Sequence, residues 1–386
     1  MEDAFLCAKD AVILLQAKLV NLHAKGGAPG LSQASKQHIS RTVSAYLSQL
    51  QLIHTAVREF LLQLAADPNA GTAVTKLLQF LKSLAEEVPG LEALEEGRPA
   101  DLAAQVRQLR AAKLEDEISA MRAAVAALPS DLPINSNTLE AVVRSLSHQE
   151  QSLDFHVKLA AEVSERFGHD AAYSIENFSY GSTPYTSWLQ VLAAAGSALG
   201  DAMGASEGRE YVVWGSSCGW LVLYGALTYG WRSRGVELLS CLHGCAERVV
   251  TEQGAALTGV KGVRFTCGDL LQDDVSNAGL VVLADQCWDE QLAAAASAKL
   301  ARELPAGALC VSYSGTGLRD IRVAKQAVAA GGGASGGDCG DAWKDKVALS
   351  CSSSVAEDAM VFEELVTLRA RVSWSEAQTF RVFRKL

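Results

Sequence analysis

Four short segments of the chain place glycines or acidic side chains where they could contact a bound ligand. The first, 215–219, reads Gly-Ser-Ser-Cys-Gly and lies between an apolar run and a helix-like segment. Its glycines let the backbone approach a ligand closely, and a helix that begins there offers free N–H groups. Glu237 ends the next apolar run, about 20 residues further on, where an acid is placed to hydrogen-bond the hydroxyl groups of a ribose.

Two more segments of this kind follow later apolar runs. Asp269 could accept a hydrogen bond from the exocyclic amine of an adenine, and Leu270 could cover its ring. The last segment, 284–288, reads Ala-Asp-Gln-Cys-Trp. Taken singly, an acid after a strand is typical of a cap. The segment 215–219 matches Gly-x-x-x-Gly, which is typical of a tight turn. It does not match the dinucleotide-binding pattern, because Ser217 replaces the middle glycine of that pattern. Together the four segments indicate one ligand at the carboxyl ends of several strands.

Short strands that alternate with helices must position these residues. Apolar runs occur at 211–215, 234–239, 263–267, 279–284 and 308–313, with Ala- and Leu-rich segments of helical length between them. This alternation predicts a mainly parallel sheet covered on both faces. Two β-leaning runs in the tail, 362–372 and 378–385, are expected to form an antiparallel hairpin that closes the sheet. The glycine-rich stretch 330–337 reads as a loop or insertion, and 347–351 as a further strand without an assigned place in the sheet.

The first 170 residues read as helix almost throughout. Apolar residues recur at helical spacing along 4–27, 34–68, 72–90 and about 100–128, and a fifth helix begins near Asn137. Five helices with short connections predict an antiparallel bundle. No repeat of solenoid length is visible, so a repeat architecture is not expected.

The order of the segments in the second half resembles that of class I methyltransferases, which depend on S-adenosylmethionine (SAM). The segment 178–185, Phe-Ser-Tyr-Gly-Ser-Thr-Pro-Tyr, resembles a loop of the disruptor-of-telomeric-silencing family of histone lysine methyltransferases, where it precedes the first strand and folds over SAM. Val372-Ser373-Trp374 stands where that family has a valine–serine–tryptophan turn before its last strand. The resemblance covers roughly residues 170–386 and is spread along the whole domain.

The resemblance implies a fold, a domain division and a set of site residues. The fold is a Rossmann-like, seven-stranded and mostly parallel sheet, preceded by an all-helical domain at 1–135, a linking helix and cofactor-covering loop at 136–205, and a SAM-binding domain at 206–386. The residues implied to bind SAM are Tyr180, Gly181, Thr183, Gly215, Ser216, Gly219, Glu237, Asp269 and Leu270. The residues implied at the methyl-transfer site are Asp285, Gln286 and Tyr313, with Tyr185 and Trp288 in the substrate channel.

The chain departs from the family pattern at three places. The loop has Ser182 where the family has a glutamate. The first strand ends in Val213-Trp214, where the family has an acid that contacts the amino group of SAM. The family asparagine pair after the fourth strand reads Ala-Asp-Gln at 284–286. These departures bear on the identity of the substrate and on activity.

Composition excludes several other classes of protein. Hydrophobic residues make up 49% and charged residues 20%, a globular balance, and no run approaches the roughly 18 apolar residues of a membrane span. The net charge of −10 lacks the basic excess of a nucleic-acid-binding protein, so tight binding to nucleic acid is not expected. Nine scattered cysteines indicate reduced thiols, and the acidic N-terminus does not resemble a signal peptide. We expect a soluble cytoplasmic or nuclear protein.

Some further residues suggest chemistry that we do not expect them to perform. Cys241, His243 and Cys245 have a metal-like spacing but are too few to complete a zinc site. Cys218 reads as a small packing residue of the glycine segment, and His156 and His169 read as surface or capping residues. No metal is therefore predicted.

Three functions follow from this reading. The preferred one is a SAM-dependent methyltransferase that modifies a lysine of a protein, in an apolar channel that favours the neutral amine and aligns it with the methyl group. The helical region would then contact the substrate or a partner protein. The second is a methyltransferase for a small molecule or another protein atom, and the third is a degenerate SAM-binding fold that serves as a scaffold.

Overall fold

The computed structural model describes most of the chain. The described residues are 4–5, 8–9, 11–12, 15, 22, 32–67, 71–87, 99–169, 175–178, 180–205, 208–254, 257, 262–314, 318, 322–323 and 359–386. The predicted loop at 330–337, the possible strand at 347–351 and most of the first predicted helix lie outside these residues. Within the described ranges, no helix is both long enough and apolar enough to cross a membrane.

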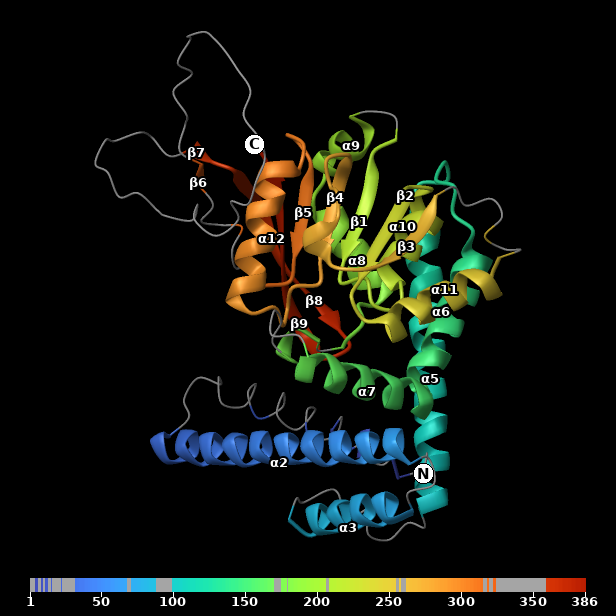
Figure 1. Ribbon diagram of the computed structural model, residues 1–386, viewed down its shortest axis with the longest axis vertical. Helices are drawn as coiled ribbons and strands as arrows, with labels where there is room; N and C mark the ends of the chain where they lie inside the picture. Colours follow the sequence, from blue (N-terminus) through green and yellow to red (C-terminus); the bar gives the residue numbers. More distant parts are fainter. Residues whose placement is uncertain are drawn as a thin grey trace.

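Seven strands form the central sheet, in the spatial order β3-β2-β1-β4-β5-β9-β8 (Figure 1). β1 to β5 are parallel, β9 runs antiparallel to β5, and β8 runs antiparallel to β9. This order confirms the predicted methyltransferase-like Rossmann fold. The strands are β1 Glu210–Trp214, β2 Arg232–Glu237, β3 Val263–Cys267, β4 Ala278–Leu283, β5 Leu309–Ser312, β8 Phe362–Val372 and β9 Ser375–Lys385, and a separate pair consists of β6 Arg322–Val323 and β7 Ala359–Met360.

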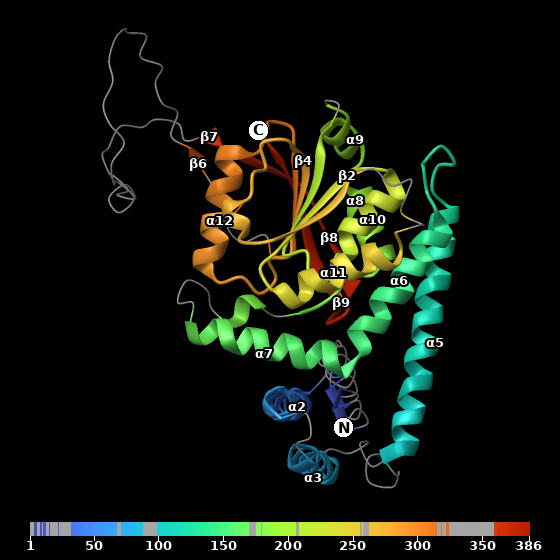
Figure 2. The same cartoon turned by 45° about the vertical axis from the view of Figure 1, so that its right-hand side comes forward.

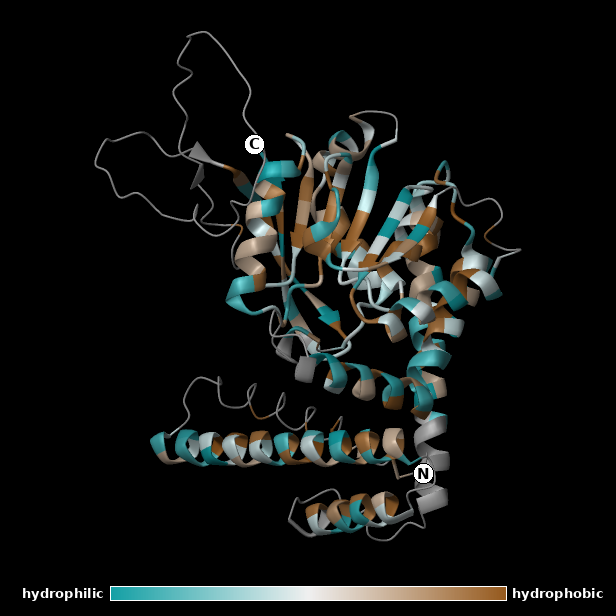
Figure 3. Ribbon diagram, viewed as in Figure 1, coloured by the Kyte–Doolittle hydropathy of each residue, from teal (hydrophilic) through white to brown (hydrophobic). Residues whose placement is uncertain are grey.

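Helices cover both faces of the sheet, as its continuous apolar strands require. Along β1, Tyr211 and Val213 point to one core, and Val212 and Trp214 point to the other. The first core is closed by α8 Tyr185–Ala194, α9 Ser197–Gly204, α10 Trp220–Tyr229 and α11 Ser240–Glu252. The second is closed by α12 Glu290–Glu303, which lies on the opposite side of the sheet in Figure 2. Figure 3 shows the apolar strands enclosed between these layers.

The direction in which successive strands are added to the sheet reverses after β3, so that β4 lies on the other side of β1. The chain proceeds outward from β1 to β2 and β3, and then returns to add β4 and β5 on the other side of β1. The crossovers at this switch point diverge and leave a crevice beyond the carboxyl ends of the strands. Short 3-10 turns, η1 Ile175–Phe178 and η2 Leu270–Gln272, lie near that edge.

Among the described residues, five helices lie in the N-terminal region, and the first two of them build a third core, separate from the two cores of the sheet. They are α2 Gln33–Ala66, α3 Gly71–Glu87, α5 Pro99–Ala126, α6 Ser136–Gln151 and α7 Leu153–His169. α2 and α3 lie side by side below α7, which runs beneath the sheet (Figures 1 and 2). Ile53, Phe60 and Leu77 belong to their core, against which Val157 of α7 packs.

The expected five-helix bundle is not what forms, because two of its helices pack elsewhere. Ile118 and Met121 of α5, and Leu139 and Leu146 of α6, are buried in the same core as Tyr211 of the sheet. The hydrophobic core therefore runs across the predicted domain boundary at 135/136. α6 and α7 also place side chains close to the carboxyl edge of the sheet.

Candidate functional site

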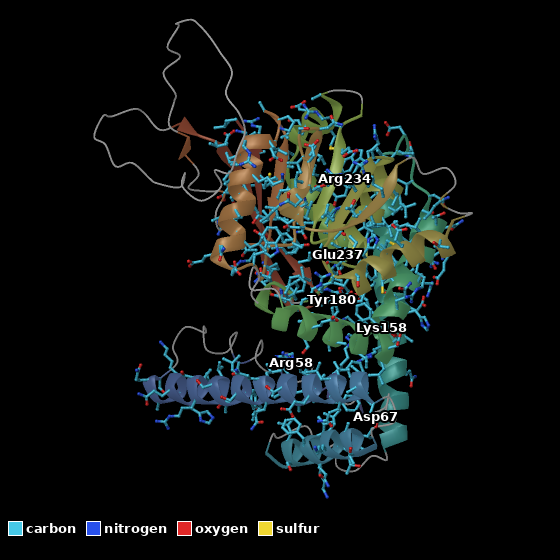
Figure 4. The ribbon with its side chains drawn as sticks, in the orientation of Figure 1. Arg58, Asp67, Lys158, Tyr180, Arg234 and Glu237 are labelled. Atoms are coloured by element: carbon cyan, nitrogen blue, oxygen red, sulfur yellow. The ribbon has the colours of Figure 1, made fainter. Side chains whose placement is uncertain are left out.

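A pocket opens at the carboxyl ends of β1, β2 and β4, where the crevice of the sheet was expected. It encloses about 730 Å³ of space, part of it open to solvent. Its lining comes from the ends of the strands, from the segment 177–181 and from the starts of α11 and α12. Figure 4 shows Glu237 and Tyr180 at this edge, between the sheet and α7. The lining residues are Asn177, Phe178, Tyr180, Gly181, Gly215, Ser217, Val236, Glu237, Leu238, Leu239, Leu242, Gly268, Asp269, Leu270, Ala284, Trp288 and Leu292.

The segment after β1 forms a turn with three left-handed residues. Gly215, Ser217 and Gly219 have φ values of +73°, +53° and +91°. Glycine adopts this conformation without strain, whereas Ser217 does so at a cost that is common at functional sites. A side chain at Gly219 would meet the Phe265 ring at 2.6 Å. This position is therefore restricted to glycine by packing as well as by conformation.

Glu237 holds this turn from the neighbouring strand. Its Oε2 accepts a hydrogen bond of 2.8 Å from the N–H of Ser217, and its Oε1 accepts one of 2.9 Å from the N–H of Leu239. The side chain is 8% exposed, and burial raises the pKa of its carboxyl despite these backbone hydrogen bonds. Each carboxylate oxygen retains a further lone pair for the hydroxyl groups of a ligand.

The segment after β3 supplies the second acid of the pocket. Asp269 caps η2, because its Oδ1 accepts a hydrogen bond of 2.8 Å from the N–H of Leu271. Its neighbours Gly268 and Leu270 also line the pocket. The structure thus brings Asp269 and Leu270 to the same space as Glu237, as expected for one ligand that spans two strand ends.

The predicted cofactor loop reaches the pocket through Tyr180 and Gly181. The N–H of Ser182 donates to Ser373 Oγ at 2.9 Å, and the N–H of Ser373 donates to the carbonyl oxygen of Ser182 at 2.9 Å. A Cβ on Gly181 would overlap the ring of Trp374. The loop and the Val-Ser-Trp turn, far apart in sequence, therefore support each other at this edge.

The phenol of Tyr180 points to a buried carboxylate rather than to a ligand. Tyr180 Oη and Trp220 Nε1 both donate hydrogen bonds to Oε1 of Glu150 on α6. Burial raises the pKa of Glu150 to about 7. His156 lies against the backbone of Glu150, with its Nε2 2.8 Å from that carbonyl oxygen, and burial lowers its pKa to about 3. Glu150 thus joins the helical region, the loop and the start of α10.

Among the described residues, several of the predicted site positions do not line the pocket. Thr183, Ser216, Gly219, Tyr185, Asp285, Gln286 and Tyr313 are the positions concerned.

The predicted transfer residues Asp285 and Tyr313 are held by the protein itself. Asp285 is 3% exposed, and its carboxylate accepts hydrogen bonds from the hydroxyl groups of Ser312 and Ser314 and from the N–H of Tyr313. The Tyr313 hydroxyl lies 2.6 Å from Thr183 Oγ1. These bonds fix the end of β5 against the cofactor loop, so neither polar group is directed at the pocket.

Tyr185 and Gln286, two more of the predicted site residues, also bond to other protein groups. Tyr185 is 3% exposed, and its hydroxyl lies 3.0 Å from Thr228 Oγ1. Its ring packs against Trp188 and Tyr224 in the first core, where it cannot form a substrate channel. Gln286 is exposed and accepts a hydrogen bond of 2.8 Å from Gln378 Nε2. Trp288 is the predicted channel residue that the structure does bring to the pocket.

Ser217 and Asn177 are pocket residues that the sequence analysis did not select. The hydroxyl of Ser217 is buried and has no hydrogen-bond partner in the described part of the chain. The position of Ser217 between two glycines is the feature of the sequence that could have indicated it. Asn177 exchanges hydrogen bonds with Asp289, the N-cap of α12, at 2.7 and 2.8 Å. No sequence pattern indicated that pair, because the two residues are 112 positions apart.

Comparisons with known proteins describe what the chain resembles. No protein-family model and no curated protein match it. Solved structures do. A Salinibacter ruber RNA methyltransferase with S-adenosyl-L-homocysteine is 25% identical over 33% of this chain and 83% of its own, with a TM-score of 0.25.

Two further structures are similar over parts of the chain. A TehB-like SAM-dependent methyltransferase from Corynebacterium glutamicum is 20% identical over 52% of this chain and 96% of its own, with a TM-score of 0.28. A geranyl diphosphate C-methyltransferase from Streptomyces coelicolor is 19% identical over 31% of this chain, with a TM-score of 0.25, and the match spans 43% of that enzyme. The fold assignment of this chain rests on its own strand order and register.

Proposed function

We propose that the chain is a SAM-dependent methyltransferase. The observation that carries the proposal is the carboxylate of Glu237, which lines the pocket at the end of β2 beside the left-handed turn after β1. In an open α/β sheet, an acid at this position binds ribose hydroxyls. The strand order supports the same conclusion, because an antiparallel β9 beside β5 is the arrangement expected of a class I methyltransferase.

The residues of the pocket suit the parts of SAM. Glu237 would accept hydrogen bonds from the ribose hydroxyls, Asp269 would accept one from the adenine amine, and Leu270 would cover the ring. Ser217 adds an unpartnered buried hydroxyl at the turn, within the described residues. Of the residues that the structure describes, a Cβ on Gly268 would meet only Thr266, at 3.9 Å, so this side of the pocket stays wide.

SAM, when bound, supplies an electrophilic methyl group on a sulfonium. The chain's own residues then have to orient the acceptor, exclude water from the site and keep the acceptor uncharged, since methyl transfer needs little acid–base machinery. Trp288, Phe178 and Leu292 form an apolar side of the pocket and would lower the pKa of a bound amine by disfavouring its charged form.

The acceptor we propose is the amine of a protein lysine. Its support is the aromatic and apolar lining around Trp288, together with the resemblance of the loop 178–185 and of the turn 372–374, which hydrogen-bond to each other through Ser182 and Ser373. This choice of acceptor is distinct from the proposal of SAM-dependent transfer. Either can fail without the other.

A small-molecule acceptor is the second candidate, and one observation favours it. The polar groups expected to orient a lysine, Asp285 and Gln286, bond to other protein groups and do not line the pocket in the described residues. The scaffold alternative draws on Trp214, which stands in place of the first-strand acid and donates to Asp273 Oδ2 at 2.9 Å.

Two experiments separate these functions. Incubation of a cell lysate with the protein and radiolabelled SAM should label protein bands, and mass spectrometry should find methyl-lysine in them. Label confined to small molecules would favour the second candidate. Measurable binding of SAM without any transfer to lysate would favour the scaffold.

A further inference from the structure

A second cavity lies between α11 and the junction of α6 with α7. It encloses about 620 Å³ of space, part of it open to solvent, and shares no lining residue with the pocket at the strand ends. Leu242 of α11 faces the first pocket, whereas Cys241, Cys245 and Arg248, spaced by about one helical turn, face the second. The residues that line it are Gln149, Ser152, Asp154, Phe155, Lys158, Ser240, Cys241, Gly244, Cys245 and Arg248.

Two features indicate that the protein leaves this space open. Gly244 lies inside α11, where glycine weakens a helix relative to alanine, yet a Cβ there would meet no atom of the described residues within 4 Å. Gln149 is 9% exposed, and neither atom of its side-chain amide has a hydrogen-bond partner among the described residues. A buried amide without partners is unfavourable unless something else satisfies it.

The rim of the cavity carries a positive excess. Lys158 and Asp154 form an ion pair of 2.7 Å with 58% and 69% of their side chains exposed (Lys158 is labelled in Figure 4). Arg248 is exposed and forms no ion pair with any residue that the structure describes. Two cations and one acid therefore favour a ligand with a negative charge.

The two thiols of the cavity differ in their surroundings. Burial raises the pKa of the Cys241 thiol, and so does the carboxylate of Glu162, which accepts hydrogen bonds from the N–H groups of Ser240 and Cys241. Cys245 is 6% exposed, and a hydrogen bond from Cys218 lowers its pKa against the opposing effect of burial, as do the nearby charges of Arg248 and Lys158. Because the thiolate is the reactive form and both cations of the rim line the same cavity, we expect Cys245 to be the better nucleophile of the pair.

We propose that Cys245 is a thiol-modification site and that the cavity around it admits small disulfides bearing carboxylate groups. The Cys245 thiolate would attack one sulfur of such a disulfide. A new S–S bond to Cys245 forms as the old S–S bond breaks, and the leaving thiolate departs with that electron pair and takes a proton from water. Cys245 is oxidised to a mixed disulfide, and half of the reagent is reduced to a thiol.

The test uses the full chain and a limiting amount of dithiobis(nitrobenzoic acid), a disulfide with two carboxylates. Non-reducing mass spectrometry identifies the modified residue, with fragment spectra that separate Cys241 from Cys245. We expect an adduct at Cys245, or the Cys218–Cys245 disulfide formed from it, at least about tenfold faster than an adduct at Cys241 or at the exposed Cys267. Equal or faster reaction of Cys241, or reaction of Cys267 alone, would overturn the proposal.

A matched pair of reagents tests the preference for an anion. Dithiodipyridine is a disulfide without charge, so the ratio of the two rates at Cys245 cancels the reactivity of the thiol itself. We expect Arg248→Gln combined with Lys158→Gln to lower that ratio by about tenfold, while Arg302→Gln on α12 leaves it unchanged. An unchanged ratio in the double variant would show that the cavity does not recognise carboxylates.

Discussion

The backbone N–H of Ser217 donates a hydrogen bond of 2.8 Å to Oε2 of Glu237, and this contact joins two neighbouring strand ends. The acid therefore has two tasks, since it stabilises a left-handed residue of the turn and also faces the pocket. Loss of its charge should disturb both. This relationship leads to the first prediction.

SAM binding should weaken as the pH falls. Burial raises the pKa of Glu237, so its carboxylate begins to take up a proton at a higher pH than an ordinary glutamate does. The protonated form accepts hydrogen bonds less well. Calorimetry between pH 5 and pH 8 should show a Kd for SAM that rises toward low pH in the native protein and stays nearly flat in Glu237→Gln. Parallel profiles would exclude Glu237 as the titrating group.

Gly181→Ala should weaken SAM binding and lower the stability of the fold. The new methyl group would overlap the ring of Trp374, so the loop must move away from the turn at 373–374. Overpacking of this kind costs about 1–3 kcal/mol. Gly200→Ala in α9 is the control, because its Cβ meets no atom within 4 Å in the described part of the chain, and we expect it to be neutral or slightly stabilising. In a Trp374→Ala background the cost of Gly181→Ala should shrink, and an undiminished cost would show that Trp374 is not its cause.

Glu150→Gln should remove part of the pH dependence of stability. Burial raises the pKa of Glu150 to about 7, so the folded protein holds a proton there that the unfolded chain releases near its ordinary value of 4.5. The free energy of unfolding should therefore fall by up to about 3 kcal/mol as the pH rises through this window, and then level off. The neighbouring charges are Lys9 and Glu117, and Tyr180 and Trp220 donate to the carboxylate.

Glutamine keeps an oxygen that can accept both hydrogen bonds but cannot ionise. Denaturant titrations at pH 5, 6, 7 and 8 should give a flatter stability profile for Glu150→Gln than for the native protein, with the variant the more stable at pH 8. Glu247→Gln, at an exposed position of α11, should follow the native profile. If Glu150→Gln also follows it, the carboxyl titrates as an ordinary one.

A chain that begins at Pro99 should still bind SAM, and one that begins at Asn137 should not. Ile118 and Met121 are 0% and 1% exposed in the core that they share with the sheet, and only the longer chain retains them. Loss of a buried side chain of this size costs about 2–5 kcal/mol. Circular dichroism and SAM calorimetry on both chains would test this. Folding and binding by the shorter chain would mean that the predicted boundary at 135/136 separates independent domains.

Much of the fold could be predicted because its signals are local. The apolar runs at 211–215, 263–267 and 362–372 correspond closely to β1, β3 and β8. β2 begins two residues earlier than expected, because Arg232 and Ser233 also belong to the strand, where Ser233 pairs with Tyr211 and Val263 of the neighbouring strands. A strand that begins with two polar residues cannot be read from apolarity alone.

The packing of the helices could not be predicted, because helical periodicity shows which face is buried but not against what. α5 and α6 carry the expected apolar stripes, yet these stripes pack on the sheet side rather than on α2 and α3. In the same way, the residue types at the strand ends indicated Glu237 and Asp269. They did not show that the carboxylate of Asp285 would accept hydrogen bonds from the hydroxyl groups of Ser312 and Ser314.

The central claim is that the pocket at the strand ends binds SAM and that Glu237 takes part. Its most direct test is isothermal calorimetry of SAM with the native protein, Glu237→Ala and the exposed control Glu247→Gln at one pH near 8, with each variant's fold checked by its Tm. We predict saturable binding to the native protein and to Glu247→Gln, and a loss of about 1.5–3 kcal/mol in Glu237→Ala, which is about 10- to 150-fold in Kd. Absence of SAM binding to the folded native protein, or equal affinity in all three proteins, would contradict the account.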